Sequence, residues 1–168
     1  MPEAFIGLGS NLCGESDGLH KTPKMQIECA IDKINSHKKI SIQRVSSLYQ
    51  TPAIGPGDQP DYINAAAKIE ADIGAYELLD ALQSIEHQQG RIRQQRWGAR
   101  TLDLDLLMYD QLIEDTAKLT LPHPRAHERA FVLAPLADLN PDLIIPNHGR
   151  VIDLLANCSM QGIVKLSN

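Results

Sequence analysis

The stretch "RWGARTLDLDLLMY", residues 96–109, places two acidic side chains inside an apolar run. Leucines occupy positions 102, 104 and 106, and Asp103 and Asp105 alternate with them. In a β-strand successive side chains point to opposite faces, so the leucines share one face and the aspartates share the other. The pattern therefore predicts a strand over 101–109, with the leucines in a core and the two carboxylates about 7 Å apart.

Two carboxylates at this spacing repel each other, and each favours protonation of its neighbour. A divalent cation relieves the repulsion, and Mg²⁺ commonly takes one or two carboxylates together with substrate phosphates and water. A solvated face of a sheet, or a cross-sheet partner that neutralises the acids, is the alternative. Asp103 and Asp105 therefore predict a magnesium site, with a polar strand face as the competing interpretation.

Four arginines directly precede the acids, at positions 91, 93, 96 and 100. Guanidinium groups bind phosphate oxygens in bidentate fashion. Beside metal-bound phosphates they would balance the charge on the transferred and leaving groups of a phosphoryl or pyrophosphoryl transfer. A solvated basic loop on an acidic protein is the alternative.

Length and composition favour a single soluble domain, which we expect to span residues 1–168. A formal net charge of −5 does not suggest nucleic-acid binding. The three cysteines lack the spacing of a zinc site, and the N-terminus lacks the pattern of a signal peptide. Because no stretch approaches 18 apolar residues, we expect no membrane span and a cytoplasmic protein.

The remaining sequence predicts an α+β fold. We expect strands over 4–10, 40–51, 62–73 and 101–109, helices over 23–37 and 75–90, and loops over 11–22 and 52–60. A C-terminal extension would hold a short strand and loop (119–129), a helix (129–139) that Pro135 breaks or kinks, a short helix (151–156) and a last strand (162–166). The order β-α-β-β-α-β matches a ferredoxin-like α/β sandwich, an antiparallel sheet with helices on one face.

Two further groups of residues suggest ligand contacts. The segment "PHPRAHERAF" supplies His123, Arg125, His127 and Arg129, a cluster suited to a nucleoside triphosphate. The scarce aromatic residues beside loops, Tyr62, Trp97 and Phe131, are candidates for stacking on a flat heterocycle, with plain packing as the alternative. No GxxxxGK[ST] motif occurs, so ATP would not be held by a P-loop.

The motif "RWGARTLDLDLL" resembles the signature of the 6-hydroxymethyl-7,8-dihydropterin pyrophosphokinases, enzymes of folate biosynthesis. Other family-typical segments follow in order: "GLGSNL" (7–12), "SSLYQTPAIGPGDQPDYINAA" (46–66), "IEHQQGRIR" (85–93) and "LPHPRAHERAFVLAPL" (121–136). The resemblance implies a ferredoxin-like fold. It also implies transfer of pyrophosphate from ATP to the hydroxymethyl group of the pterin, with release of AMP.

The resemblance also implies residue roles. Asp103 and Asp105 match the family's Mg²⁺ ligands, with two ions bridging the triphosphate. Arg91 and Arg100 match arginines that contact phosphates and assist transfer, and Trp97 lies on the catalytic loop that closes over both substrates.

Binding roles follow in the same way for the two substrates. Tyr62 and Phe131 would sandwich the pterin ring, and Asn64 would hydrogen-bond its polar edge with the backbone around Thr51 and Ile54. The ATP side would be lined by Glu86, His123 and Arg129.

Other functions remain compatible with parts of the pattern. A metal-dependent nuclease or phosphohydrolase would use the same acids and arginines on water, and would leave Tyr62, Asn64 and Phe131 without a role. A non-catalytic nucleotide-binding module would bind ATP without turnover, since fold alone does not determine function. An RNA binder is disfavoured by the acidic charge and the absence of an aromatic RNP-type strand.

We expect a monomer whose partners are ATP and the pterin, with no nucleic acid and no membrane.

Overall fold

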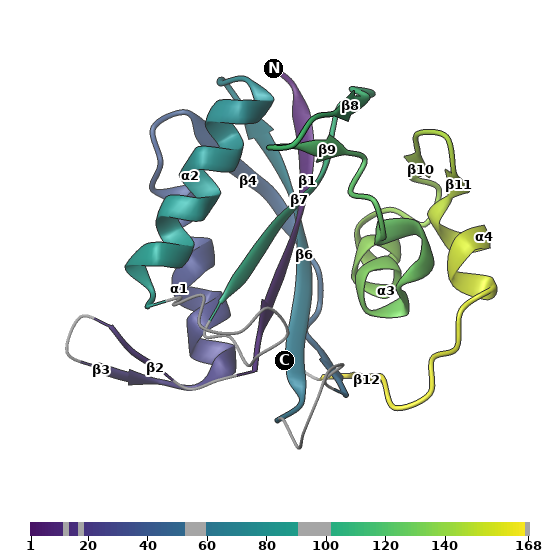
Figure 1. Cartoon of the computed structure of the whole chain (residues 1–168). Helices are drawn as coiled ribbons and strands as arrows, with labels where there is room; N and C mark the ends of the chain where they lie inside the picture. Colours follow the sequence, from purple (N-terminus) through teal and green to yellow (C-terminus); the bar gives the residue numbers. More distant parts are fainter. Residues whose placement is uncertain (12–13, 17–18, 53–59, 91–101, 167–168) are drawn as a thin grey trace.

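A six-stranded antiparallel sheet forms the centre of the protein (Figure 1). The structure is a computed structural model and describes residues 1–11, 14–16, 19–52, 60–90 and 102–166. The strands of the sheet are β1 (Glu3–Ser10), β4 (Ile40–Val45), β5 (Tyr49–Thr51), β6 (Tyr62–Ala71), β7 (Asp103–Tyr109) and β12 (Val164–Lys165). Their order is β12-β5-β6-β1-β7, with β4 also paired to β6. The Leu-Asp strand, β7, therefore lies at one edge and the C-terminal strand at the other.

Helices α1 (Pro23–Asn35) and α2 (Ala75–Gln88) cover one face of this sheet (Figure 1). Helix α1 begins as predicted, with Thr22 Oγ1 accepting a hydrogen bond from the Met25 N–H at 3.3 Å and with proline in the first turn. Helix α2 ends just before Gly90, which adopts a φ of +83°. The apolar residues that the two helices bury in this core are Ile27, Ala30 and Ile34 on α1 and Ala75, Leu78, Leu82 and Ile85 on α2.

The second face of the sheet is also covered, which corrects the expectation of helices on one face only. Helices α3 (Ala130–Leu139) and α4 (Val151–Ala156) form a second core there with Phe5, Ala66, Leu107 and Met108 of the sheet. The single turn η1 (Ala126–Glu128) precedes α3. The physical reason is visible in β1, whose residues from Ala4 to Ser10 are nearly all buried, so that both of its faces require cover.

Three local predictions need correction. The predicted loop 11–22 contains a hairpin, β2 (Gly14–Ser16) and β3 (Leu19–Lys21). The predicted strand 40–51 is two strands, because Ser46 Oγ accepts a hydrogen bond from the Ala66 N–H at 2.9 Å and so replaces a backbone partner in the ladder. Pro135 does not break α3, which is continuous from Ala130 to Leu139. The proline there lacks the N–H that would bond the carbonyl four residues earlier, but the helix continues through it.

The C-terminal half adds two small hairpins, one beside each core. They are formed by β8 (Glu114–Asp115) with β9 (Thr120–Leu121) and by β10 (Ile144–Ile145) with β11 (Gly149–Arg150). The first hairpin is attached to α2, since Tyr76 Oη donates to Glu114 Oε2 at 2.9 Å and Lys118 pairs with Asp80 at 2.9 Å. Among the described residues no helix is long and apolar enough to cross a membrane.

Candidate active site

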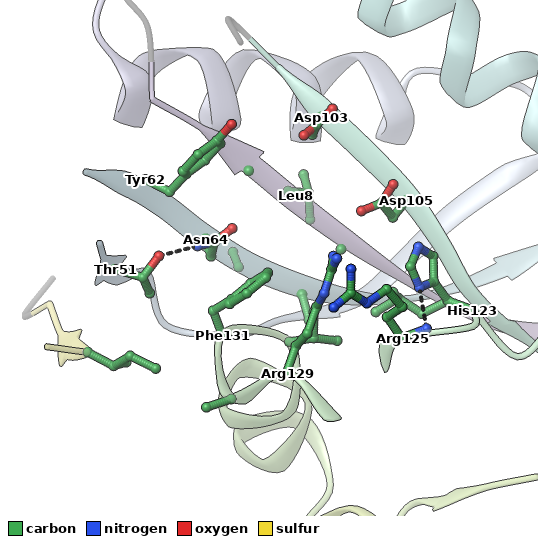
Figure 2. A pocket seen from close by; sticks show the side chains of 18 of the residues that line it. Leu8, Thr51, Tyr62, Asn64, Asp103, Asp105, His123, Arg125, Arg129 and Phe131 are labelled. Atoms are coloured by element: carbon green, nitrogen blue, oxygen red, sulfur yellow. Dashed lines mark hydrogen bonds between the residues drawn. The ribbon is translucent and has the colours of Figure 1, made fainter. Parts of the chain in front are cut away.

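A cavity of about 830 Å³ opens on the face of the sheet that α3 covers (Figure 2). Its floor is formed by β1, β6 and β7, and its opposite wall by the segment from His123 to Val132. The cavity contains Asp103 and Asp105 from β7, and Tyr62 and Asn64 from β6. The sheet thus brings together two acids with an aromatic and an amide side chain that lie about 40 positions earlier in the chain.

Two glycines of β1 leave room beside the carboxylates. Gly9 pairs with Asp103 and Gly7 with Asp105 across the two strands. A Cβ atom on Gly9 would lie 2.8 Å from Asn64 Oδ1, well inside van der Waals contact. The segment "GLGSNL" was identified from the sequence only as family-typical, and this role was not predicted. The available signal was the two-residue spacing of the glycines in a strand, which places both on one face.

The alternation predicted for β7 is confirmed. Leu102, Leu104 and Leu106 are buried in the core under α1 and α2, whereas both aspartates line the cavity. Asp105 is exposed and Asp103 is half-buried.

The donor set fits Mg²⁺. Two carboxylates on one strand face, opposite residues without side chains, allow an ion whose other ligands are phosphate oxygens and water. Within the described part of the chain no group of three or more His, Cys, Asp or Glu residues could enclose a metal. The two carboxylates would supply only part of the coordination, which suits an ion that arrives with a phosphate substrate.

Cationic side chains face the acids across the cavity. Arg125 and Arg129 extend from the segment before α3, and the Arg129 guanidinium carbon lies 5.4 Å from the centre of the Phe131 ring. Burial lowers the pKa of Arg129 and Arg125 lowers it further, while Asp105, Glu128 and Asp103 oppose the shift. Arg125 Nε also pairs with Glu128 Oε1 at 3.1 Å in the same wall. The wall opposite the carboxylates therefore carries two guanidinium groups, which suit the binding of an anion.

His123 is a neutral imidazole at neutral pH. Burial, and then the charges of Arg129 and Arg125, lower its pKa to about 4. Its Nδ1 accepts a hydrogen bond from the Arg125 N–H at 3.2 Å, so the ring hydrogen lies on Nε2. His123 can therefore donate one hydrogen bond to a phosphate oxygen without adding a charge.

The other end of the cavity suits a flat heterocycle. Tyr62 comes from the sheet and Phe131 from α3, so the two rings line the space from different layers (Figure 2). Asn64 Nδ2 donates to Thr51 Oγ1 at 2.8 Å, which fixes the amide and leaves its oxygen beside Gly9. The arrangement offers stacking surfaces together with an oriented amide acceptor.

A smaller cavity of about 260 Å³ adjoins the first, and both are lined by Asp105 and His123. Glu86 lies in this smaller cavity and not in the larger one. It is 4% exposed, and its Oε2 accepts the Leu104 N–H of the edge strand at 2.8 Å. The predicted ATP-side residues are thus divided, with Glu86 in the small cavity, Arg129 in the large one and His123 in both.

Several residues of the smaller cavity were missed from the sequence. They are Gln83 on α2 and Lys118 and Thr120 on the β8–β9 hairpin. No local pattern distinguishes them, because the hairpin and helix meet only in the folded chain.

Comparison with known proteins identifies the family. A family model described as 7,8-dihydro-6-hydroxymethylpterin-pyrophosphokinase (HPPK) matches residues 5–141. The chain belongs to this family. A 2-amino-4-hydroxy-6-hydroxymethyldihydropteridine pyrophosphokinase of Haemophilus influenzae is 41% identical over 167 residues and covers 99% of both chains. The corresponding Pseudomonas aeruginosa protein is 42% identical over 166 residues, covering 99% of this chain and 98% of its own.

HPPK sequences also occur within longer chains. The folic acid synthesis protein fol1 of Schizosaccharomyces pombe is 35% identical over 161 residues, which is 95% of this chain and 21% of that one. A solved HPPK-DHPS structure of Plasmodium falciparum superimposes with a TM-score of 0.64, covering 92% of this chain and 42% of that one. Its sequence identity is 13%, so this likeness concerns the fold alone.

The family predicted from the sequence is therefore confirmed. Part of the predicted HPPK site falls on residues that the structure does not describe. Arg91, Arg100, Trp97 and Ile54 lie outside the described residues, as do the arginines at positions 93 and 96. Their roles remain predictions. The described residues bring together most of the other predicted groups, with Arg125, Asp103, Asp105, Thr51, Tyr62, Asn64, His123, Arg129 and Phe131 lining one cavity. Glu86 lies in the smaller cavity, and His127 lines neither cavity because its ring stacks on His148.

Proposed function

We propose that this protein transfers pyrophosphate from ATP to the hydroxymethyl group of 6-hydroxymethyl-7,8-dihydropterin, giving the pterin diphosphate and AMP. The proposal rests on three features that share one cavity. They are the carboxylate pair, the arginines that face it, and an aromatic-amide end formed by Tyr62, Phe131 and Asn64. A hydrolase needs only the first two of these features. The aromatic-amide end supplies a place for the acceptor of the transferred group.

Asp103 and Asp105 would hold Mg²⁺, with two ions in the proposed complex. When bound, Mg²⁺ would neutralise phosphate charge and align the triphosphate. Arg129 and Arg125 would balance the charge that develops on the transferred and leaving groups, together with Arg91 and Arg100.

The reaction joins the hydroxymethyl oxygen to the β-phosphorus of ATP and breaks the bond from that phosphorus to the oxygen that stays with AMP. Asn64 and the two rings would hold the heterocycle, so that the hydroxyl points toward the carboxylate end of the cavity. The hydroxyl loses its proton during transfer, and Asp103 or Asp105 is the proposed acceptor because both line the same cavity. His123 Nε2 would donate to a phosphate oxygen.

The smaller cavity is the proposed place of the adenosine half of ATP. It meets the larger cavity at Asp105 and His123, so a triphosphate can extend from one into the other. Its lining combines apolar Leu79, Leu106 and Leu119 with polar Gln83 and Lys118, as a purine requires. Trp97 would close over both substrates.

We also propose that the core is a ferredoxin-like βαββαβ unit. Without the small hairpins and β12, the strands follow the order β7-β1-β6 with β4 and β5 beside β6, and α1 and α2 share one face. We expect residues 1–168 to act as one domain, monomeric and cytoplasmic. A net charge of −5 supports small-molecule partners over nucleic acid or an anionic membrane.

The test is a product assay with ATP, Mg²⁺ and 6-hydroxymethyl-7,8-dihydropterin that separates AMP from ADP. AMP formed only when the pterin is present is the expected result. ADP and phosphate formed regardless of the pterin would instead indicate a hydrolase, and ATP binding without any product would indicate a non-catalytic module.

A further inference from the structure

The C-terminal segment, residues 159–165, borders the large cavity although it is far from every other part of the site in sequence. Ser159, Gln161 and Ile163 line the cavity. Met160 and Val164 are 42% and 56% exposed and do not line it. Ser159 and Gln161 are exposed as well, and Ile163 is half-buried. Side chains that border the cavity therefore alternate with side chains that do not.

Backbone pairing attaches this segment to the strand that carries Thr51. Val164 pairs with Gln50 and Lys165 with Tyr49, so β12 extends the sheet beside β5. The Leu166 N–H donates to the Leu48 carbonyl at 2.8 Å and continues the attachment. The position of the segment is thus coupled to the Thr51–Asn64 hydrogen bond that orients the site amide.

A side-chain contact adds to the pairing. Lys165 Nζ lies 3.1 Å from Asp138 Oδ1 on α3, and the same carboxylate accepts the Ser47 N–H at 3.2 Å. The segment therefore joins β5 and α3, the elements that carry Thr51 and Phe131.

Gly162 allows the closest approach between the segment and the rest of the site. Its φ is +81°, and a Cβ atom there would lie 2.8 Å from Pro52 Cγ and 3.3 Å from Pro52 Cδ. Pro52 itself lines the cavity. A larger residue at position 162 would be strained in its backbone and would push the segment away from Pro52.

We propose that residues 159–163 form the end wall of the pterin half of the site, and that Ile163 and Gln161 determine affinity for that substrate. Ile163 would pack against the heterocycle, and the Gln161 amide would pair with its donor and acceptor groups. The sheet order supports the assignment, because β12 and β7 lie at opposite edges and the wall is therefore remote from the carboxylates. This inference rests on the proposed function, which supplies the identity of the ligand.

The test compares neighbouring residues that face the cavity and the solvent. Ile163→Ala is expected to raise the KM for the pterin roughly five- to tenfold, and Gln161→Ala roughly threefold, with the KM for ATP unchanged and kcat within about twofold. The matched controls Val164→Ala and Met160→Ala should leave both KM values at the wild-type level. Equal unfolding temperatures for the four variants would show that the segment remains folded.

Gly162→Val provides an independent variant that displaces the wall without removing a side chain that lines the cavity. It should raise the KM for the pterin at least as much as Ile163→Ala. The proposal is overturned if Ile163→Ala and Val164→Ala behave alike, or if the KM for ATP rises with that for the pterin.

Failure of the proposed function would be recognised separately. If wild-type protein forms no pterin-dependent AMP, calorimetry with the pterin replaces the kinetic assay. If the pterin binds Ile163→Ala more weakly than Val164→Ala, the proposed end wall is supported. Equal binding to the two variants, or no binding to wild type, would overturn it.

Discussion

The two faces of the central sheet differ in what they contribute, although the same strands supply both. On the α1 and α2 face, β1 contributes Ile6 and Leu8 and β7 contributes Leu104 and Leu106, all at most 4% exposed. On the opposite face the intervening positions are glycines in β1 and aspartates in β7. The first face is therefore filled by apolar side chains, and the second leaves space and charge for a ligand.

The second face is itself divided. Where α3 packs, Phe5, Ala66, Leu107 and Met108 form a closed apolar core. Toward Gly9 and Asn64 the same face opens into the cavity. The closed part holds α3 in place, and α3 in turn holds Phe131 and positions Arg129 at its start.

Replacing either carboxylate is the strongest test of this difference between the two faces of the sheet. Asp103→Asn or Asp105→Asn should lower kcat by about 10³-fold, or about 4 kcal/mol, because the amide weakens Mg²⁺ binding and removes the proposed proton acceptor. The melting temperature should change little, since both side chains lie outside the apolar cores. Rate assays and thermal unfolding would be measured together, and a variant with full activity would exclude the carboxylates from the chemistry.

Ile6→Ala, on the face of the sheet that α1 and α2 cover, should show the reverse pattern, because Ile6 is fully buried and lines neither cavity. Removing this packed isoleucine is expected to reduce the free energy of unfolding by about 2–5 kcal/mol. The activity of the fraction that remains folded should stay within severalfold of wild type. Urea unfolding gives the first quantity, and assays below the transition give the second. If activity fell as far as in Asp105→Asn, the two faces would not be separable.

Protonation of His123, which lines the cavity, makes the free energy of unfolding depend on pH. Its pKa is about 4 in the fold and 6.5 ordinarily, so the unfolded chain binds more protons between these values. The contribution of neutral His123 to the free energy of unfolding is therefore complete above about pH 6.5. This contribution, roughly 1–3 kcal/mol, is lost as the pH falls toward 4. His123→Gln should flatten this dependence in urea unfolding curves, and the exposed His87→Gln is the control. An unchanged slope in His123→Gln would show that another group is responsible.

Gly9→Ala tests the open floor of the cavity. The new Cβ would meet Asn64 Oδ1 at 2.8 Å and turn the amide away from its position. The KM for the pterin should rise about tenfold, equivalent to about 1.4 kcal/mol, while the KM for ATP is retained. Gly74→Ala is the control, because nothing lies within 4 Å of a Cβ there. Similar kinetics for the two variants would contradict this role of Gly9.

Lys165→Ala should have the smallest effect. Its pair with Asp138 is largely solvated on the lysine side, so the free energy of unfolding should fall by less than about 1 kcal/mol. A rise of about twofold in the KM for the pterin is expected, because backbone pairing still holds β12. Raising the salt concentration should reduce the difference from wild type, and a salt-independent difference would point to another cause.

Much of the local structure was predictable because its signals are short-range. The Thr22–Pro23 start, the stripe on α2 and the Leu-Asp alternation each act within a few residues, and all three are present in the structure. The split at Ser46 was not predictable, since it depends on a hydrogen bond to Ala66 on another strand. The cover on the second face was also missed, because it comes from residues more than 100 positions after β1.

The sequence by itself determined the alternation that separates leucines from aspartates, the helix boundaries and the family, because these reside in spacing and in motifs. Only the tertiary structure decided that Gly9 pairs with Asp103, that His123 lies half-buried near two arginines, and that Ser159, Gln161 and Ile163 line the cavity. These features depend on strand pairing and on burial. Both arise from contacts between distant segments, whose geometry no local pattern specifies.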